Sequence, residues 1–112
     1  MSFDGRQLTF GTADRRIIGH VFEPADASRE GRGVMFIHGQ GSDQKGYEDR
    51  ARRVVEQIHA TCLTFDLSGH GRDAPNYGRR SVYDHLEDAV LAYEQLVSNP
   101  HVDRSFDHRV RE

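Results

Sequence analysis

The sequence predicts an α/β domain in which a mixed sheet is flanked by helices. Two short runs rich in β-forming residues come first, and a turn-type stretch between them is typical of an antiparallel pair. A run that is apolar on both faces follows at residues 34–37, as expected for a central parallel strand. Two helical patterns with a further strand between them come next, and a strand–helix–strand unit implies a right-handed crossover.

The first third of the chain is predicted to hold three strands. Gln7–Phe10 and Ile17–Phe22 are the antiparallel pair, and Gly11–Asp14 is the turn that joins them. A polar stretch with glycine and proline then forms a loop from Glu23 to Gly33. Val34–Ile37 is the third strand, and the loop at residues 39–46 follows it.

Two amphipathic helices are predicted on either side of a fourth strand, Thr61–Phe65. In the first helix, apolar residues at helical spacing run from Tyr47 to Ile58. The second opens at Ser81, a favourable N-cap, and stops at Asn99-Pro100. Each helix has an apolar side that we expect to face the sheet. In the second helix this stripe consists of Val82, Leu86, Ala89, Val90, Tyr93, Leu96 and Val97.

The composition limits the classes of protein to which the chain can belong. Its 112 residues suffice for one domain, and a net charge of −3 gives no reason to expect nucleic acid or an anionic membrane as a partner. Cys62 is the only cysteine, so neither an intrachain disulfide nor a cysteine-based zinc site can form. No apolar run approaches the roughly 18 residues of a membrane span. We therefore expect a cytoplasmic protein without a metal or another cofactor.

Two loops carry a resemblance to a known family. Residues 36–41 read Phe-Ile-His-Gly-Gln-Gly, which resembles the His-Gly-x-Gly loop of α/β-hydrolases, and residues 65–71 read Phe-Asp-Leu-Ser-Gly-His-Gly, which resembles the loop after the family's next strand. One helix separates the loops, as in the family. The resemblance covers roughly residues 3 to 103. It implies the N-terminal part of an α/β-hydrolase fold, with a mixed sheet of strand order 1-2-4-3.

The resemblance implies an oxyanion loop made of His38, Gly39, Gln40 and Gly41. In the family the residue after His-Gly donates a backbone N–H to the charge that develops on a carbonyl oxygen under attack, and this position is Gln40. His38 is expected to orient the loop from beneath rather than to act as a base. The alternative is a plain strand-to-helix turn in which the glycines serve only the backbone.

The second loop is expected to be structural. By resemblance, Asp66, Gly69, His70 and Gly71 form a turn in which Asp66 and His70 bond to backbone groups. Asp66, Ser68 and His70 could also be interpreted as a catalytic triad. The sequence favours the structural role much more strongly than this interpretation.

The nucleophile elbow of the family, Gly-x-Ser-x-Gly, is absent, because none of the seven serines has glycine at both positions two residues away. Residues 1–103 are therefore interpreted as a truncated hydrolase-like domain and the charged residues 104–112 as an irregular tail. Intact relatives act on small-molecule esters or amides, whereas this chain is expected to be inactive alone. Without the family's next strand, Val34–Ile37 would be an exposed edge, which predicts self-association.

Two other classes of function stay open. The chain could be a non-catalytic binding or regulatory module. It could also be a dinucleotide-binding strand–helix–strand unit, since Gly39-Gln40-Gly41 follows a strand and Asp66 ends the next one. Gln44 stands where that fingerprint requires its third glycine, which disfavours this last interpretation.

Overall fold

The computed structural model describes residues 5–25 and 31–103. Within them, four strands form one sheet: β1 (Arg6–Gly11), β2 (Arg16–Phe22), β3 (Gly33–Phe36) and β4 (Thr61–Phe65). Their order is β1-β2-β4-β3, as the sequence predicts. β1 pairs with β2 and β2 with β4 in antiparallel orientation, and β3 runs parallel to β4.

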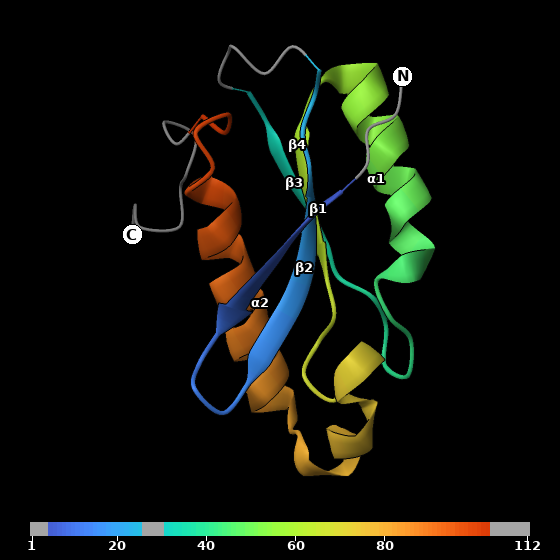
Figure 1. Cartoon of the computed structure of the whole chain (residues 1–112), viewed down its shortest axis with the longest axis vertical. Helices are drawn as coiled ribbons and strands as arrows, with labels where there is room; N and C mark the ends of the chain where they lie inside the picture. The colour runs from blue at the N-terminus through green and yellow to red at the C-terminus, as the bar shows by residue number, and fades with distance from the viewer. Residues whose placement is uncertain (1–4, 26–30, 104–112) are drawn as a thin grey trace.

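Helices cover both faces of this sheet. α1 (Lys45–Ile58) lies on one side and α2 (Val82–Val97) on the other (Figure 1). β4 is central, and all five of its residues are buried, including Cys62. One hydrophobic cluster fills the space between the sheet and α2, and a second lies between the sheet and α1. The predicted arrangement of a mixed sheet between helices is therefore confirmed.

A short helix, η1 (Gly71–Arg79), lies between β4 and α2, where the sequence predicts no helix. It is a 3₁₀ helix, and local polar contacts hold it: the Asp73 carboxylate accepts hydrogen bonds from the Gly69 backbone N–H (2.6 Å) and the Asn76 amide (2.6 Å). A short helix stabilised by side chains that cap their own neighbours has no hydrophobic period to reveal it. No helix of the described part of the chain is long and apolar enough to cross a bilayer.

The packing of α2 corrects one prediction. Leu96 and Val97 of its apolar stripe are buried as expected, but Val82, Leu86 and Val90 are 61%, 59% and 54% exposed. The side toward the sheet instead carries Asp88 and Ala92, both fully buried. The sequence prediction was wrong because it placed the apolar stripe toward the core. The side of the helix that faces the core instead carries a buried carboxylate, whose partners lie far away in the sequence.

The buried carboxylate of Asp88 is held by an ionic network. Arg15, in the turn between β1 and β2, is itself buried and donates to Asp88 (3.4 Å), to Asp84 (3.3 Å) and to Glu87. The second oxygen of Asp88 accepts the backbone N–H of Ser68, in the loop after β4, at 2.7 Å. The hydrogen bond to Glu87, against the opposing effect of burial, raises the pKa of Arg15. Three parts of the fold thus meet at one carboxylate.

Replacing Asp88 should therefore cost far more stability than replacing its exposed neighbour. We expect Asp88→Ala to lower the free energy of unfolding by about 3–5 kcal/mol, because the Arg15 charge and the Ser68 N–H would lose a buried partner. Glu87→Ala removes a half-exposed partner of the same arginine and should cost at most about 1 kcal/mol. Urea unfolding of both variants checks this, and equal losses would contradict the account.

Candidate functional site

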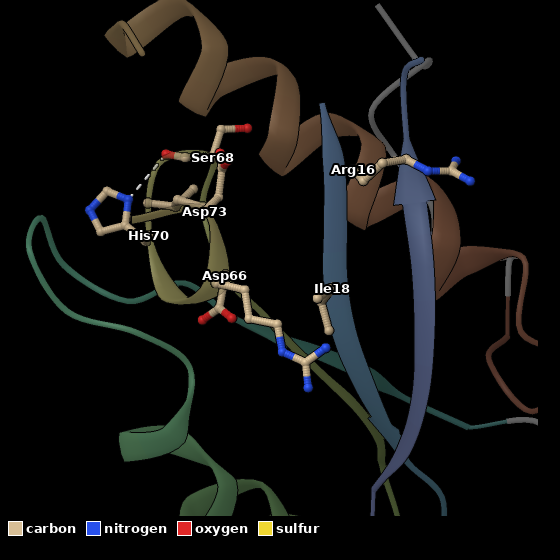
Figure 2. A pocket seen from close by; sticks show the side chains of 8 residues that line it. Arg16, Ile18, Asp66, Ser68, His70 and Asp73 are labelled. Carbon is tan, nitrogen blue, oxygen red and sulfur yellow. Dashed lines mark hydrogen bonds between the residues drawn. The ribbon is translucent and has the colours of Figure 1, made fainter. Parts of the chain in front are cut away.

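The predicted oxyanion loop and the predicted structural loop meet at one edge of the sheet. Because β3 and β4 are parallel, their carboxyl ends lie side by side, and the loop of residues 37–44 faces the loop that starts at Asp66. An open pocket of about 160 Å³ lies beside the second loop. Figure 2 shows Asp66, Ser68 and His70 on one side of this pocket and Ile18 of β2 on the other.

The first loop contains a tight turn over residues 39–42. The Ser42 backbone N–H donates to the Gly39 carbonyl at 3.1 Å, and Gly41 has a φ of +78°, which a type II turn requires at its third residue. Gln40, at the second position, is exposed. No other residue of the described ranges accepts a hydrogen bond from its backbone N–H. The turn thus leaves the N–H of the exposed Gln40 without an acceptor among the described residues.

His38 connects the two loops from below. The side chain is buried, and its Nε2 accepts the backbone N–H of Leu67 at 3.0 Å. Since Nε2 accepts, the ring proton lies on Nδ1, which donates to the Gly39 carbonyl at 2.8 Å. Both ring nitrogens of His38 are therefore engaged with backbone groups, one in each loop.

His70 makes the reciprocal connection from the second loop. Its Nε2 accepts the backbone N–H of Gly41 at 3.0 Å, and its Nδ1 donates to the Ser68 carbonyl at 3.1 Å (Figure 2). The ring is buried, with centroids 4.9 Å from His38 and 5.2 Å from Tyr77. The N–H of Gly41 is therefore already hydrogen-bonded, whereas the N–H of Gln40 has no acceptor among the described residues.

Asp66 bonds across the loops rather than to a reacting group. One carboxylate oxygen accepts the Gln44 backbone N–H (2.9 Å), and the other accepts the Gln44 side-chain amide (3.0 Å). Gly71 must approach this carboxylate closely, since a Cβ there would lie 2.4 Å from Asp66 Oδ2, and its φ of +59° also favours glycine.

Gln44 is the residue that sequence reasoning missed. Its buried amide oxygen accepts from the Thr64 hydroxyl (2.8 Å) and from His20 Nδ1 (3.0 Å). Its amide nitrogen donates to the Ile18 carbonyl (3.1 Å) as well as to Asp66. A glutamine at the start of a helix carries no sequence signal for burial. The one signal at this position is that Gln44 stands where the dinucleotide fingerprint requires glycine.

The geometry gives no support to a triad at Ser68. His70 bonds to the backbone carbonyl of Ser68, and His85 Nε2 donates to the same carbonyl at 3.0 Å. No hydrogen bond joins the Ser68 hydroxyl to a histidine among the residues that the structure describes. The loop therefore holds its backbone in place, and a hydroxyl nucleophile without a base partner is weak.

Other candidate reactive groups are also structural. Burial raises the pKa of the Cys62 thiol to about 12, so it is not a thiolate near neutral pH. Burial acts to raise the pKa of Asp73, but hydrogen bonds from Asn76 and the Gly69 backbone outweigh this effect and lower it. Within the described ranges no group of three or more histidine, cysteine, aspartate or glutamate side chains could hold a metal ion.

Comparison with known proteins defines the fold. No family model and no curated protein matches the chain. Among solved structures it is similar to a thermostable carboxyl esterase from Bacillus coagulans (15% identity, TM-score 0.68), an acylaminoacyl peptidase from Pyrococcus horikoshii (17%, 0.72) and the α/β-hydrolase GrgF from Penicillium sp. sh18 (20%, 0.60).

These similarities cover 90%, 93% and 90% of this chain but only 34%, 18% and 35% of the esterase, the peptidase and GrgF. The chain therefore spans about a third of the length of two of these proteins and less than a fifth of the other. It has the fold of part of an α/β-hydrolase, as the two loops in the sequence predict.

Proposed function

We propose that this chain supplies the oxyanion side of a serine-hydrolase site that acts on ester or amide bonds. The observation that carries the proposal concerns the exposed residue Gln40, on a turn at the carboxyl end of β3: no described residue accepts its backbone N–H. Attack on a carbonyl carbon places negative charge on the oxygen, and a donor that is already fixed in place stabilises this charge without reorganising. His38 and His70 fix this turn from both sides.

By itself the chain has no covalent route to hydrolysis. Gly-x-Ser-x-Gly is absent from its sequence, and Ser68 has a buried backbone role instead. The site would be completed by a nucleophile, a base and an acid that come from other residues. Its substrate would be a small-molecule ester or amide.

We therefore expect the purified chain not to turn over activated esters such as p-nitrophenyl acetate above the background rate. The measurement is the release of p-nitrophenolate after repeated purification, with Ser68→Ala as the comparison. Turnover that follows the protein through purification and disappears in Ser68→Ala would contradict the absence of a nucleophile.

The donor role of Gln40 can be tested separately by a transplant. Residues 38–44 would replace the corresponding loop of the Bacillus coagulans esterase. In that chimera, Gln40→Pro should lower kcat by about 10²–10³-fold, because it removes the N–H. Proline is favoured at the second position of such a turn, so the backbone can keep its shape.

Gln40→Ala in the same chimera is the matched control, since it removes the side chain and keeps the N–H. Its kcat should stay within a few-fold of that of the unmodified chimera. Equal activity of the proline and alanine variants would show that the N–H of Gln40 does not stabilise the oxyanion.

The alternatives have less support. A dinucleotide site would need free N–H groups at the start of α1 for the pyrophosphate. There Asp66 accepts the Gln44 N–H and Asp43 accepts the Lys45 N–H. A binding or regulatory module has no specific observation in its favour.

Four expectations from the sequence remain predictions. They are the absence of a cofactor, a cytoplasmic location, the division between residues 1–103 and 104–112, and association of the chain through the edge of β3. The tail at residues 104–112 lies outside the described residues.

A further inference from the structure

Hydrogen bonds rather than packing hold the turn at residues 39–42, called the first turn below. A Cβ atom at Gly39 or Gly41 would meet no heavy atom within 4 Å apart from its own chain neighbours, so packing does not fix this turn. Glycine adopts negative φ about as readily as positive φ, and Gly41 therefore permits both a type I and a type II turn. The two forms differ by a rotation of roughly 150–170° of the central peptide, which joins Gln40 to Gly41.

The loop after β4 contains a second turn of the same type, over residues 67–70. The His70 backbone N–H donates to the Leu67 carbonyl at 3.0 Å, and Gly69, at the third position, has a φ of +79°. This second turn packs closely against η1, since a Cβ atom at Gly69 would lie 2.9 Å from the Cα atom of Tyr77. Packing as well as hydrogen bonding therefore holds the second turn, in contrast to the first.

The central peptide of the second turn, between Ser68 and Gly69, is held at both ends. Its carbonyl, that of Ser68, accepts from His70 Nδ1 (3.1 Å, Figure 2) and from His85 Nε2 (3.0 Å). Its N–H, that of Gly69, donates to the Asp73 carboxylate at 2.6 Å. This peptide cannot rotate without losing these hydrogen bonds, so the Ser68 carbonyl is a fixed acceptor beside His70.

The fixed carbonyl determines the tautomer of His70. Because a carbonyl can only accept, the proton of the His70 ring must lie on Nδ1, and Nε2 keeps a lone pair. That lone pair accepts the Gly41 N–H at 3.0 Å, and this N–H belongs to the central peptide of the first turn. One histidine ring thus bonds to the central peptides of both turns.

We propose that His70 is a positioning residue that keeps the first turn in its type II form, through the tautomer that the Ser68 carbonyl imposes. In a type I turn the central peptide would be reversed, and the Gln40 carbonyl would face Nε2 in place of the Gly41 N–H. Two acceptors would then face each other, and neither would have a donor. The opposite tautomer would reverse the preference, because an N–H on Nε2 can donate to that carbonyl.

The peptides on both sides of Gln40 are fixed in this way. On the N-terminal side, the Gly39 carbonyl accepts from His38 Nδ1 at 2.8 Å. The C=O and N–H of a trans peptide point in opposite directions, so the N–H of Gln40 points away from His38. On the C-terminal side, His70 holds the Gly41 N–H. The role of this arrangement in hydrolysis rests on the proposed function, whereas the selection of the turn type by His70 does not.

NMR spectroscopy of the unmodified chain near neutral pH tests the proposal. We expect the ¹⁵N shifts of the His70 ring to show a neutral imidazole with its proton on Nδ1. We also expect a strong nuclear Overhauser effect between the Gln40 Hα and the Gly41 amide proton, which lie closer together in a type II turn than in a type I turn. A proton on Nε2 of His70, or an effect of the weak size of a type I turn, would overturn the proposal.

Two variants of His70 separate its acceptor from its bulk. His70→Phe keeps a ring but removes both nitrogens, whereas His70→Gln keeps an oxygen acceptor near the position of Nε2. Relative to the amides of β4, hydrogen exchange of the Gly41 amide should become at least about tenfold faster in His70→Phe, because its acceptor is lost. In His70→Gln it should stay within about threefold of that in the original chain. The Overhauser effect at Gly41 should weaken only in His70→Phe.

His85→Phe is the matched control, because it removes a histidine that bonds to the Ser68 carbonyl rather than to Gly41. It should leave the exchange of the Gly41 amide unchanged. Unaltered exchange in a folded His70→Phe, or equal acceleration in all three variants, would overturn the proposal. If cooperative melting shows that His70→Phe does not fold, the tautomer in the unmodified chain decides. None of these measurements uses esterase activity, so a failure here is distinct from a failure of the proposed function.

Discussion

The geometry of the loops depends on the hydrogen bonds between Gln44 and Asp66. The Asp66 carboxylate accepts hydrogen bonds from both the backbone N–H and the side-chain amide of Gln44. That amide also donates to the Ile18 carbonyl, and its oxygen accepts from the Thr64 hydroxyl and from His20. Through these bonds one side chain joins β2, β4 and the start of α1. A buried polar network of this kind stabilises only when every member is satisfied, because each orphaned group costs about 1–3 kcal/mol.

Beside this network, two histidines determine which backbone donors of the loops are used. The N–H groups of Leu67 and Gly41 are taken by His38 and His70, each through an unprotonated Nε2. The N–H of Gln40 lies between these fixed points on an exposed turn. Stabilisation of an oxyanion requires this combination of a rigid support and an unused donor, since a mobile donor would have to be ordered during the reaction.

The sequence predicted the parts of the fold that depend on local periodicity and on order along the chain. The strands of alternating or continuous apolar residues, both long helices and the order of the sheet were correct. The contacts between polar residues far apart in sequence could not be predicted. Arg15 and Asp88 are 73 residues apart, and a carboxylate near the start of a helix is usually attributed to the helix dipole rather than to burial. The exposed side of α2 was misassigned for the same reason.

The central claim is that Gln44 and Asp66 act as a pair, and a double-mutant cycle tests it most directly. The free energy of unfolding would be measured by urea denaturation for the original chain, Gln44→Ala, Asp66→Ala and the double variant. We predict that the sum of the two single losses in the free energy of unfolding exceeds the loss in the double variant by at least about 1 kcal/mol. The reason is that the second change removes a group whose partner the first change has already removed. Losses that add to within about 0.5 kcal/mol would show that the two residues stabilise the fold independently, and would contradict the account.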